Sequence, residues 1–243
     1  MRNCQVMRLA PSRPQRLAVL IAFTAASLVL TSPPLAAQSL DQLSVRDATA
    51  GLKAALDKGA AAAVQSLGRT DGFWANPKVR IPLPDHLQRI RSALRLMGKA
   101  EEVDALELAV NRAAEQAVPQ AKTLLTNAVK SMSVDDAKQI LRGGDDSVTQ
   151  FFKSKTAPQL SDRFLPIVRQ VTQRSGLAQQ YNALAGQGAA FGLVKPEQAT
   201  VERYVTQKAL DGLYTMIAEE EKKIRADPLA AGSDIIRRVF GAL

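Results

Sequence analysis

Residues 201–225, VERYVTQKALDGLYTMIAEEEKKIR, constrain the fold more than any other stretch of the chain. The stretch contains no proline, and a turn of about 100° per residue spreads its apolar side chains over more than half of a helix circumference. These are Tyr204, Val205, Ala209, Leu210, Leu213, Tyr214, Met216 and Ile217. A helix that is apolar on most of its sides belongs in the middle of a bundle, so we expect the other segments to pack around it.

Gly212 lies inside this apolar arc. A glycine in a helix interior costs about 1 kcal/mol relative to alanine, so it needs a packing reason. The position therefore predicts that another part of the chain approaches the helix closely.

The N-terminus has the layout of a secretory signal peptide. Four arginines and no acidic residue precede the apolar run Leu17–Leu30, which is followed by Pro33, Pro34 and the small residues Ala36 and Ala37. The run is shorter than the roughly 20 residues that a membrane span needs, which favours cleavage near Ala37. Residues 1–37 are therefore predicted to be a signal peptide, and the mature protein is expected in the periplasm with no transmembrane span.

Removal of the leader changes both charge and cysteine content. The leader holds four of the 32 basic residues and the only cysteine, Cys4, so the net charge falls from +9 to +5 and no thiol remains. Cys4 precedes the apolar run, which leaves no acylation site for a lipoprotein. The small, dispersed basic excess, without stacking aromatics among the basic residues, argues against nucleic acid as a partner.

The mature chain is expected to be all-α, with residues 38–243 forming one domain, a helical bundle of about nine or ten helices. The predicted helices cover 43–67, 85–97, 99–117, 133–142, 145–155, 158–175 and 201–225, with a last helix starting at Asp227 and Pro228. Pro119 is expected to kink or restart the 99–117 helix, whose apolar face continues to Met132, and residues 177–194 are expected to be helical at first and then glycine-rich. Ser133 and Asp136 have the spacing of a capping box, and Gly68 and Gly98 end their helices. Prolines are expected to start the helix at 158 and to bend it at 166.

Residues 69–84, RTDGFWANPKVRIPLP, are predicted to form an extended, proline-rich strap, since Gly72 and three prolines oppose a regular helix. The strap contains Phe73, the sole tryptophan Trp74, and Asn76. Binding residues concentrate on loops, which makes these three candidate contact residues. The competing interpretation is that Phe73 and Trp74 anchor a long connection to the bundle.

Few residues suit catalysis or metal binding. His86 is the only histidine, which excludes a multi-histidine metal site, and the spacing of Gly186, Gly188 and Gly192 does not fit a dinucleotide-binding loop. We predict no cofactor, no metal and no catalytic residue.

Three acidic residues remain as candidate binding positions. Asp145 and Asp146 follow a Gly-Gly pair near other carboxylates, where helix capping competes with cation binding. Glu220 projects from the apolar side of the 201–225 helix. If it is buried there, it is a candidate acid or base. If it is exposed, it is an ordinary partner in an ion pair.

Four stretches together resemble a bacterial family, domain of unknown function 4197: NPKVRIPLP, NRAAEQAVPQAK, GGDDSVTQFF and YVTQKALDGLYTMIAEEEKKIRADP. The resemblance covers nearly all of residues 45–241. It implies an exported, helical, single-domain protein and brings no established activity, cofactor or catalytic residue. Many relatives resemble lipoproteins, whereas this chain lacks a cysteine after its leader.

Three functions agree with these observations. The first is a non-catalytic protein of the cell envelope that binds a partner protein or a ligand. The second is a carrier of an apolar or lipid-like molecule in a crevice lined by Phe151, Phe152, Phe164 and Tyr214, and the third is an enzyme with an acidic site. The competing interpretation is that these four aromatic residues form part of the hydrophobic core and line no crevice.

Overall fold

The computed structural model describes residues 45–144, 146–190, 195 and 199–227. By its contacts the chain divides into residues 1–36 and 37–243, and every described residue lies in the second unit. These residues form helices and connections without a strand, which confirms the predicted all-α class. The helices are α1 (Val45–Leu67), α2 (Asp85–Arg89), α3 (Arg91–Leu96), α4 (Ala100–Ala117), the 3-10 turn η2 (Val118–Gln120), α5 (Ala121–Lys130), α6 (Val134–Arg142), α7 (Ser147–Thr172), α8 (Gly176–Ala190) and α9 (Val201–Ala226).

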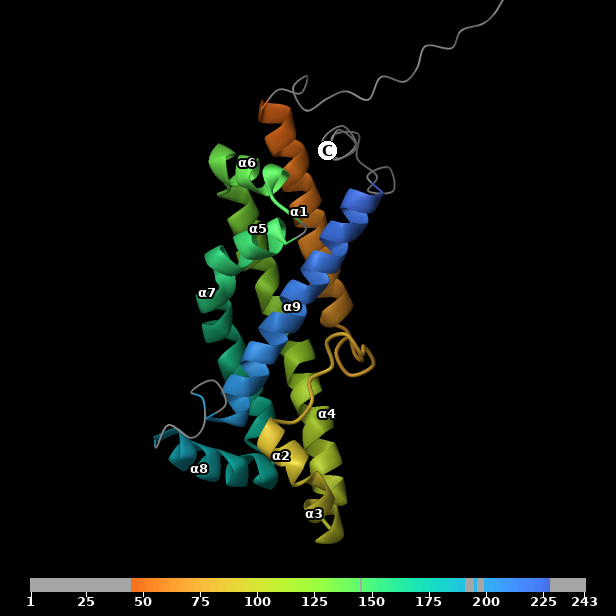
Figure 1. Cartoon of the computed structure of the whole chain (residues 1–243), viewed down its shortest axis with the longest axis vertical. Coiled ribbons are helices and arrows are strands. Elements are labelled where there is room, and N and C mark those ends of the chain that lie inside the picture. Colours follow the sequence, from red (N-terminus) through yellow and green to blue (C-terminus); the bar gives the residue numbers. More distant parts are fainter. Residues whose placement is uncertain (1–44, 145, 191–194, 196–198, 228–243) are drawn as a thin grey trace, which may run out of the picture. The chain divides into compact units, whose positions relative to one another are not determined.

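Helix α9 occupies the centre, as its wide apolar arc predicts. It packs against α7, α1 and α4, and Figure 1 shows it crossing the bundle obliquely beside them. Its N-terminus is capped by Thr200, whose hydroxyl accepts a hydrogen bond from the backbone N–H of Arg203. Helix α7 has the same length as α9, 26 residues.

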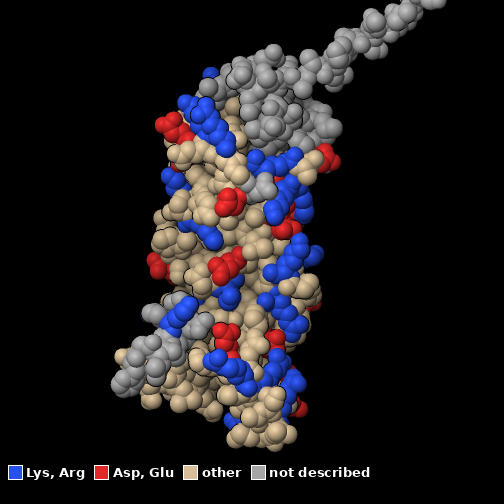
Figure 2. Space-filling model, in the orientation of Figure 1, with Lys and Arg blue, Asp and Glu red and all other residues tan. Residues whose placement is uncertain are grey.

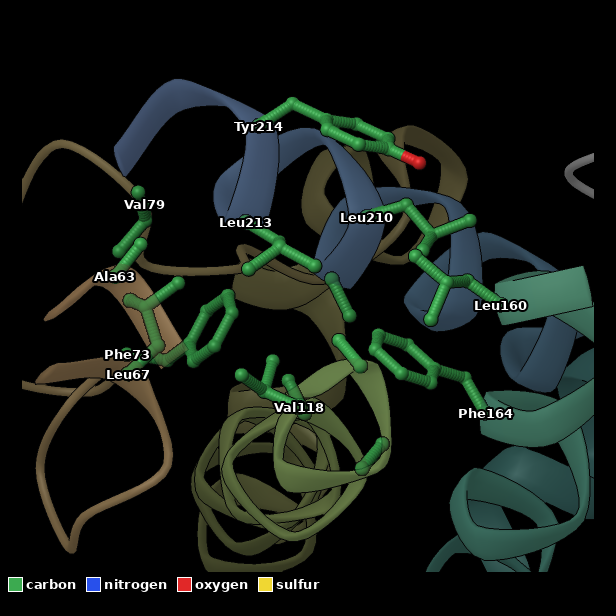
Figure 3. Packing of buried hydrophobic residues seen from close by; sticks show 14 of the residues in the cluster. Ala63, Leu67, Phe73, Val79, Val118, Leu160, Phe164, Leu210, Leu213 and Tyr214 are labelled. Atoms are coloured by element: carbon green, nitrogen blue, oxygen red, sulfur yellow. The ribbon is translucent and has the colours of Figure 1, made fainter. Parts of the chain in front are cut away.

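The core is one continuous cluster of aliphatic and aromatic side chains. Figure 3 shows the ring of Phe73 lying between Leu67, Val118 and Leu213, while Phe164 packs near Leu160 and Leu210. Two hydroxyl groups meet inside it, because Oγ1 of Thr156 lies 3.0 Å from the phenol oxygen of Tyr214. The phenol therefore has a hydrogen-bond partner although its side chain is buried.

Helix α7 differs from the prediction of two helices separated at Pro158. It runs without interruption from Ser147 to Thr172 and contains both Pro158 and Pro166. Both prolines are exposed, so the carbonyl groups that lose an N–H partner lie on the side of the helix that faces water. The opposite face buries Phe152, Leu160 and Phe164, and this packing holds the helix together across the prolines.

The predicted helix 85–97 is broken. Ile90 leaves helical geometry at φ −95°, ψ 4° and separates α2 from α3. Helix α3 ends at Gly98, which has φ +74°, and the N–H of Lys99 reaches back to the carbonyl of Leu94 as in a Schellman motif. The break turns α3 relative to α2 and leaves Ile90 exposed.

The strap 69–84 is extended only in its last part. From Arg69 to Arg80 it forms consecutive tight turns, including hydrogen bonds from the N–H of Asn76 to the carbonyl of Phe73 and from the N–H of Arg80 to the carbonyl of Asn76. These turns bring the side chain of Phe73 into the core. The prediction of an extended strap is therefore wrong for residues 69–79.

The extended part of the strap is held by one buried amide on α4. The side chain of Asn111 accepts a hydrogen bond from the N–H of Ile81 and donates one to its carbonyl, both at 2.8 Å. Asn111 is fully buried and also donates to the carbonyl of Glu107. Its amide thus replaces the neighbouring strand that an extended backbone would otherwise need.

The short helix α6 begins with the predicted capping box. The hydroxyl of Ser133 accepts from the N–H of Asp136, and the Asp136 carboxylate accepts from the N–H and the hydroxyl of Ser133. These hydrogen bonds, aided by Lys155, lower the pKa of Asp136.

Candidate functional site

The candidate residue Phe73 belongs to the core. Its ring is fully buried, and its backbone N–H donates to Oε1 of Glu115 at 3.0 Å. The N–H of Trp74 donates to the same oxygen at 3.2 Å, while Arg112 binds the other carboxylate oxygen at 2.7 Å and also reaches Asp71. The buried Glu115 therefore anchors the turn of the strap, and the side chain of Phe73 is not open to a surface ligand.

Trp74 and Asn76 lie at the surface of the strap and are half-buried. The guanidinium of Arg80 lies 3.7 Å from the centroid of the Trp74 ring, and the same guanidinium pairs with Glu107. The amide of Asn76 lies 3.8 Å from the sulfur of Met216. One face of the indole is therefore covered by a cation, and a contact role for these two residues stays a prediction.

The acidic candidates do not converge. Asp146 is exposed at the start of α7 and makes no capping hydrogen bond with its side chain, while Asp145 lies outside the described residues. Glu220 pairs with Lys223 at 2.6 Å, one turn along α9. Within the described ranges, no three His, Cys, Asp or Glu side chains form a group that could hold a metal ion.

The aromatic crevice considered from the sequence is filled by its own side chains. Phe151, Phe152, Phe164 and Tyr214 are all buried in the core cluster. Of the four, Phe151 also borders a hollow between α6 and α7.

An apolar groove lies between α2, α3 and α8, and no sequence argument had identified it. Its volume is about 360 Å³. The apolar lining consists of Leu87, Ile90, Leu94, Leu177, Leu184 and Ala185. Leu87, Leu177 and Ala185 form a buried floor, whereas Ile90 is 48% exposed and Leu184 is 72% exposed.

Helix α8, which forms one wall, has no charged side chain in its 15 residues, GLAQQYNALAGQGAA. On the face shown in Figure 2, basic and acidic side chains are interspersed over the bundle, and the lower end, where Figure 1 places α8 and α3, carries uncharged patches beside basic side chains. Leu96 at the end of α3 is 91% exposed. Exposed leucines beside a helix without charged side chains are typical of a binding surface.

Polar groups lie at the edge of the groove. His86, Gln180 and Tyr181 contribute to its lining, and Nη2 of Arg89 lies 2.7 Å from Nδ1 of His86. A guanidinium only donates hydrogen bonds, so Nδ1 accepts and the imidazole proton sits on Nε2. Burial, with a smaller effect of the Asp85 charge, raises the pKa of the Tyr181 phenol, which therefore stays neutral.

Two other hollows are larger but more polar. One, of about 380 Å³, lies between α6 and α7 beside Asp136 and Gln150. The other, of about 550 Å³, lies beside Arg169, Arg203 and the buried Glu202. The Glu202 carboxylate accepts hydrogen bonds from Thr172 at 2.8 Å and Asn182 at 2.9 Å, so its role in joining α7, α8 and α9 is structural.

The comparison with known families gives one match. The family described as Protein of unknown function (DUF4197) matches residues 42–241. The chain belongs to this family. The resemblance stated from the four sequence stretches is thereby confirmed. No curated protein and no solved structure matches the chain.

The DUF4197 match includes the strap, the central helix and all three helices of the apolar groove. Within this DUF4197 domain, no described helix is both long and apolar enough to cross a membrane. The sequence did contain a signal for the groove: α8 has glutamine and asparagine where a surface helix would usually carry charges. Surface helices usually carry charged residues on their outer face, so a surface helix without charged residues is unusual.

Proposed function

We propose that this protein is an exported, non-catalytic binding protein that holds an apolar molecule in the groove between α2, α3 and α8. The uncovered aliphatic groove beside an uncharged helix carries this proposal. Ligand sites are commonly concave and apolar, with a few polar groups at defined positions, and volumes of about 300–1,000 Å³ are typical. The groove fits that description with His86 and Gln180 at its edge.

The distribution of ionisable groups favours binding over catalysis. The carboxylates with lowered pKa values, Asp104, Asp136 and Glu219, owe them to hydrogen bonds and ion pairs outside the groove. Among the phenols with raised pKa values, Tyr204 and Tyr214 belong to the core, and Tyr181 alone lies in the lining of the groove. An acid–base site would instead bring such groups together in a cleft.

A fluorescence titration tests the binding proposal. The mature protein, residues 38–243, is titrated with the uncharged probe N-phenyl-1-naphthylamine, which becomes fluorescent in apolar surroundings. We expect saturable binding that weakens by about tenfold or more in Ile90→Glu, because a charge would then lie in the groove.

Val134→Glu is the matched control, since Val134 on α6 is 45% exposed and Ile90 is 48% exposed. A glutamate at the first position of α6 also suits the helix dipole. Binding that is not saturable, or that weakens equally in both variants, would contradict the proposal.

Export is part of the same proposal and rests on the leader, residues 1–37. We expect the mature protein in the periplasmic fraction with an N-terminus near Gln38. Cell fractionation with N-terminal sequencing measures this, and an intact leader retained in the membrane would refute it.

A further inference from the structure

The groove selects a particular ligand shape. Most of its lining residues are aliphatic, and within the described part of the chain Tyr181 and His86 contribute the only rings of the lining. Flat aromatic ligands are usually held by stacking rings, whereas a flexible alkyl chain needs only aliphatic contact. A volume of about 360 Å³ lies near the lower end of the range for ligand sites, which suits one chain and not two.

Arg89 lies outside the lining of the groove but contacts the ring of His86, which belongs to that lining. Within the described residues, no acidic side chain lies at ion-pair distance from Arg89, whose recorded partner is the His86 ring. The neighbouring Arg91 and Arg95 are different, because both pair with Asp104, at 2.8 Å and 2.9 Å. Arg89 thus keeps donors for a ligand, and Nε2–H of His86 adds another beside it.

Asp85 is the acidic residue closest in sequence, four positions before Arg89. Its charge raises the pKa values of Tyr181 and Tyr204, so it acts on the phenols between α8 and α9. It forms no ion pair with Arg89 in the described structure. Arg89 therefore supplies a positive charge beside His86, a lining residue of the groove.

We infer that the ligand is a single-chain anionic amphiphile of the fatty-acid class, with its alkyl chain in the groove and its carboxylate at Arg89 and His86. This inference rests on the proposed function, because it identifies the ligand of the same groove. A guanidinium binds a carboxylate through two parallel hydrogen bonds, and the nearby imidazole adds a third donor. The head group remains at the edge, in contact with water, and the chain covers Ile90 and Leu184.

Calorimetric titration of the mature protein with three amphiphiles tests the head group separately from the chain. Dodecanoate, dodecanol and dodecyltrimethylammonium each contain a chain of twelve carbon atoms, with the carboxylate carbon counted in dodecanoate, and they differ in charge. At about pH 8 the carboxylate is ionised. We expect dodecanoate to bind about tenfold tighter than dodecanol, and the cation to bind weakest, because one charge-assisted interaction is gained or lost.

Two substitutions on α2 form a matched pair. Arg89→Gln should lower the affinity for dodecanoate to that for dodecanol, whereas Asp85→Asn should keep or increase the preference for dodecanoate. Circular dichroism and the thermal midpoint establish that both variants are folded.

Three other outcomes would overturn the inference. Equal binding of dodecanoate and dodecanol, or tighter binding of the cation, would overturn the anionic ligand and leave the apolar groove intact. Failure of the probe and of all three amphiphiles to bind would overturn the proposed function as well. A dimer in sedimentation that Ile90→Glu dissociates would show that a second copy occupies the groove, which would also overturn the inference.

Discussion

Gly212 and Phe73 lie so close that a Cβ atom added to the glycine would be 2.7 Å from Cε1 of the phenylalanine ring. The same Cβ would lie 3.3 Å from Cβ of Val79. The glycine in the apolar arc of α9 thus makes room for the strap. The strap enters the core at this point, and the central helix cannot carry a side chain there without moving it.

Gly212→Ala should therefore destabilise the protein by about 1–3 kcal/mol, because the buried ring has no free space to move into. Gly186→Ala is the control, since no atom lies within 4 Å of its added Cβ. An exposed helical glycine replaced by alanine should stabilise by about 0.5–1 kcal/mol. Urea denaturation measures both, and Phe73→Leu in the Gly212→Ala background should recover part of the loss. Equal, favourable effects of both alanines would contradict the packing argument.

Asn111→Ala should cost at least about 2 kcal/mol, because it leaves both the N–H and the carbonyl of Ile81 buried without partners. Hydrogen exchange at the Ile81 amide should accelerate with it. Asn127→Ala, at an exposed position of α5, is the control and should change the unfolding free energy by no more than about 0.5 kcal/mol. Unchanged exchange at Ile81 would mean that the amide does not hold the strap.

Leu213→Ala should destabilise by about 2–5 kcal/mol, because the side chain is fully buried between α9 and the strap. Leu96→Ala, where the leucine is 91% exposed, provides the comparison and should have a small effect. Reversible denaturation of both variants gives the values. A loss below about 1 kcal/mol for Leu213→Ala would contradict the central position of α9.

Alkaline pH should weaken the fold through Tyr204. Burial first, and then the charges of Asp85 and Tyr181, raise the pKa of Tyr204 from 10.0 to about 12. The pKa of Tyr204 is higher in the folded state than in the unfolded state, so the folded protein favours the neutral phenol. The contribution of this phenol to stability is therefore fully present below pH 10.0 and is lost as the pH rises toward 12. The unfolding free energy should decline over this window, and Tyr204→Phe should make the decline shallower. Denaturation at several pH values, with tyrosinate absorbance, measures this, and an unchanged slope would contradict it.

The fluorescence of Trp74 should report on the strap. The indole is half-buried and one face is covered by Arg80 at 3.7 Å, so we expect partial protection from an added quencher. Arg80→Gln should increase quenching by iodide, because it exposes that face of the ring. Lys78→Gln is a suitable control, since Lys78 pairs with Glu219 and has no contact with the ring among those recorded. Equal quenching in the two variants would show that the stack does not persist in solution.

The sequence alone determined the features that depend on local interactions. The period of apolar residues predicted the helices and the central place of 201–225, and Ser133, Asp136 and Gly98 marked helix ends through hydrogen bonds within a few residues. Gly212 correctly predicted a close approach. These features depend on neighbours within a few turns, and such neighbours are visible in the order of residues.

Tertiary structure decided the rest, because the contacts join distant parts of the chain. Proline chemistry predicts a helix boundary at Pro158, yet packing of Phe152, Leu160 and Phe164 on the core outweighs it. Glu115 resembles an ordinary helix-surface residue in the sequence, and only the fold brings the backbone of Phe73 to it. The groove also depends on contacts between distant parts of the chain. The spacing of apolar residues predicts a helix, but it does not predict which apolar side chains the neighbouring helices leave uncovered. Ile90 and Leu184 are exposed together because α2 and α3 separate at Ile90 and α8 lies beside them.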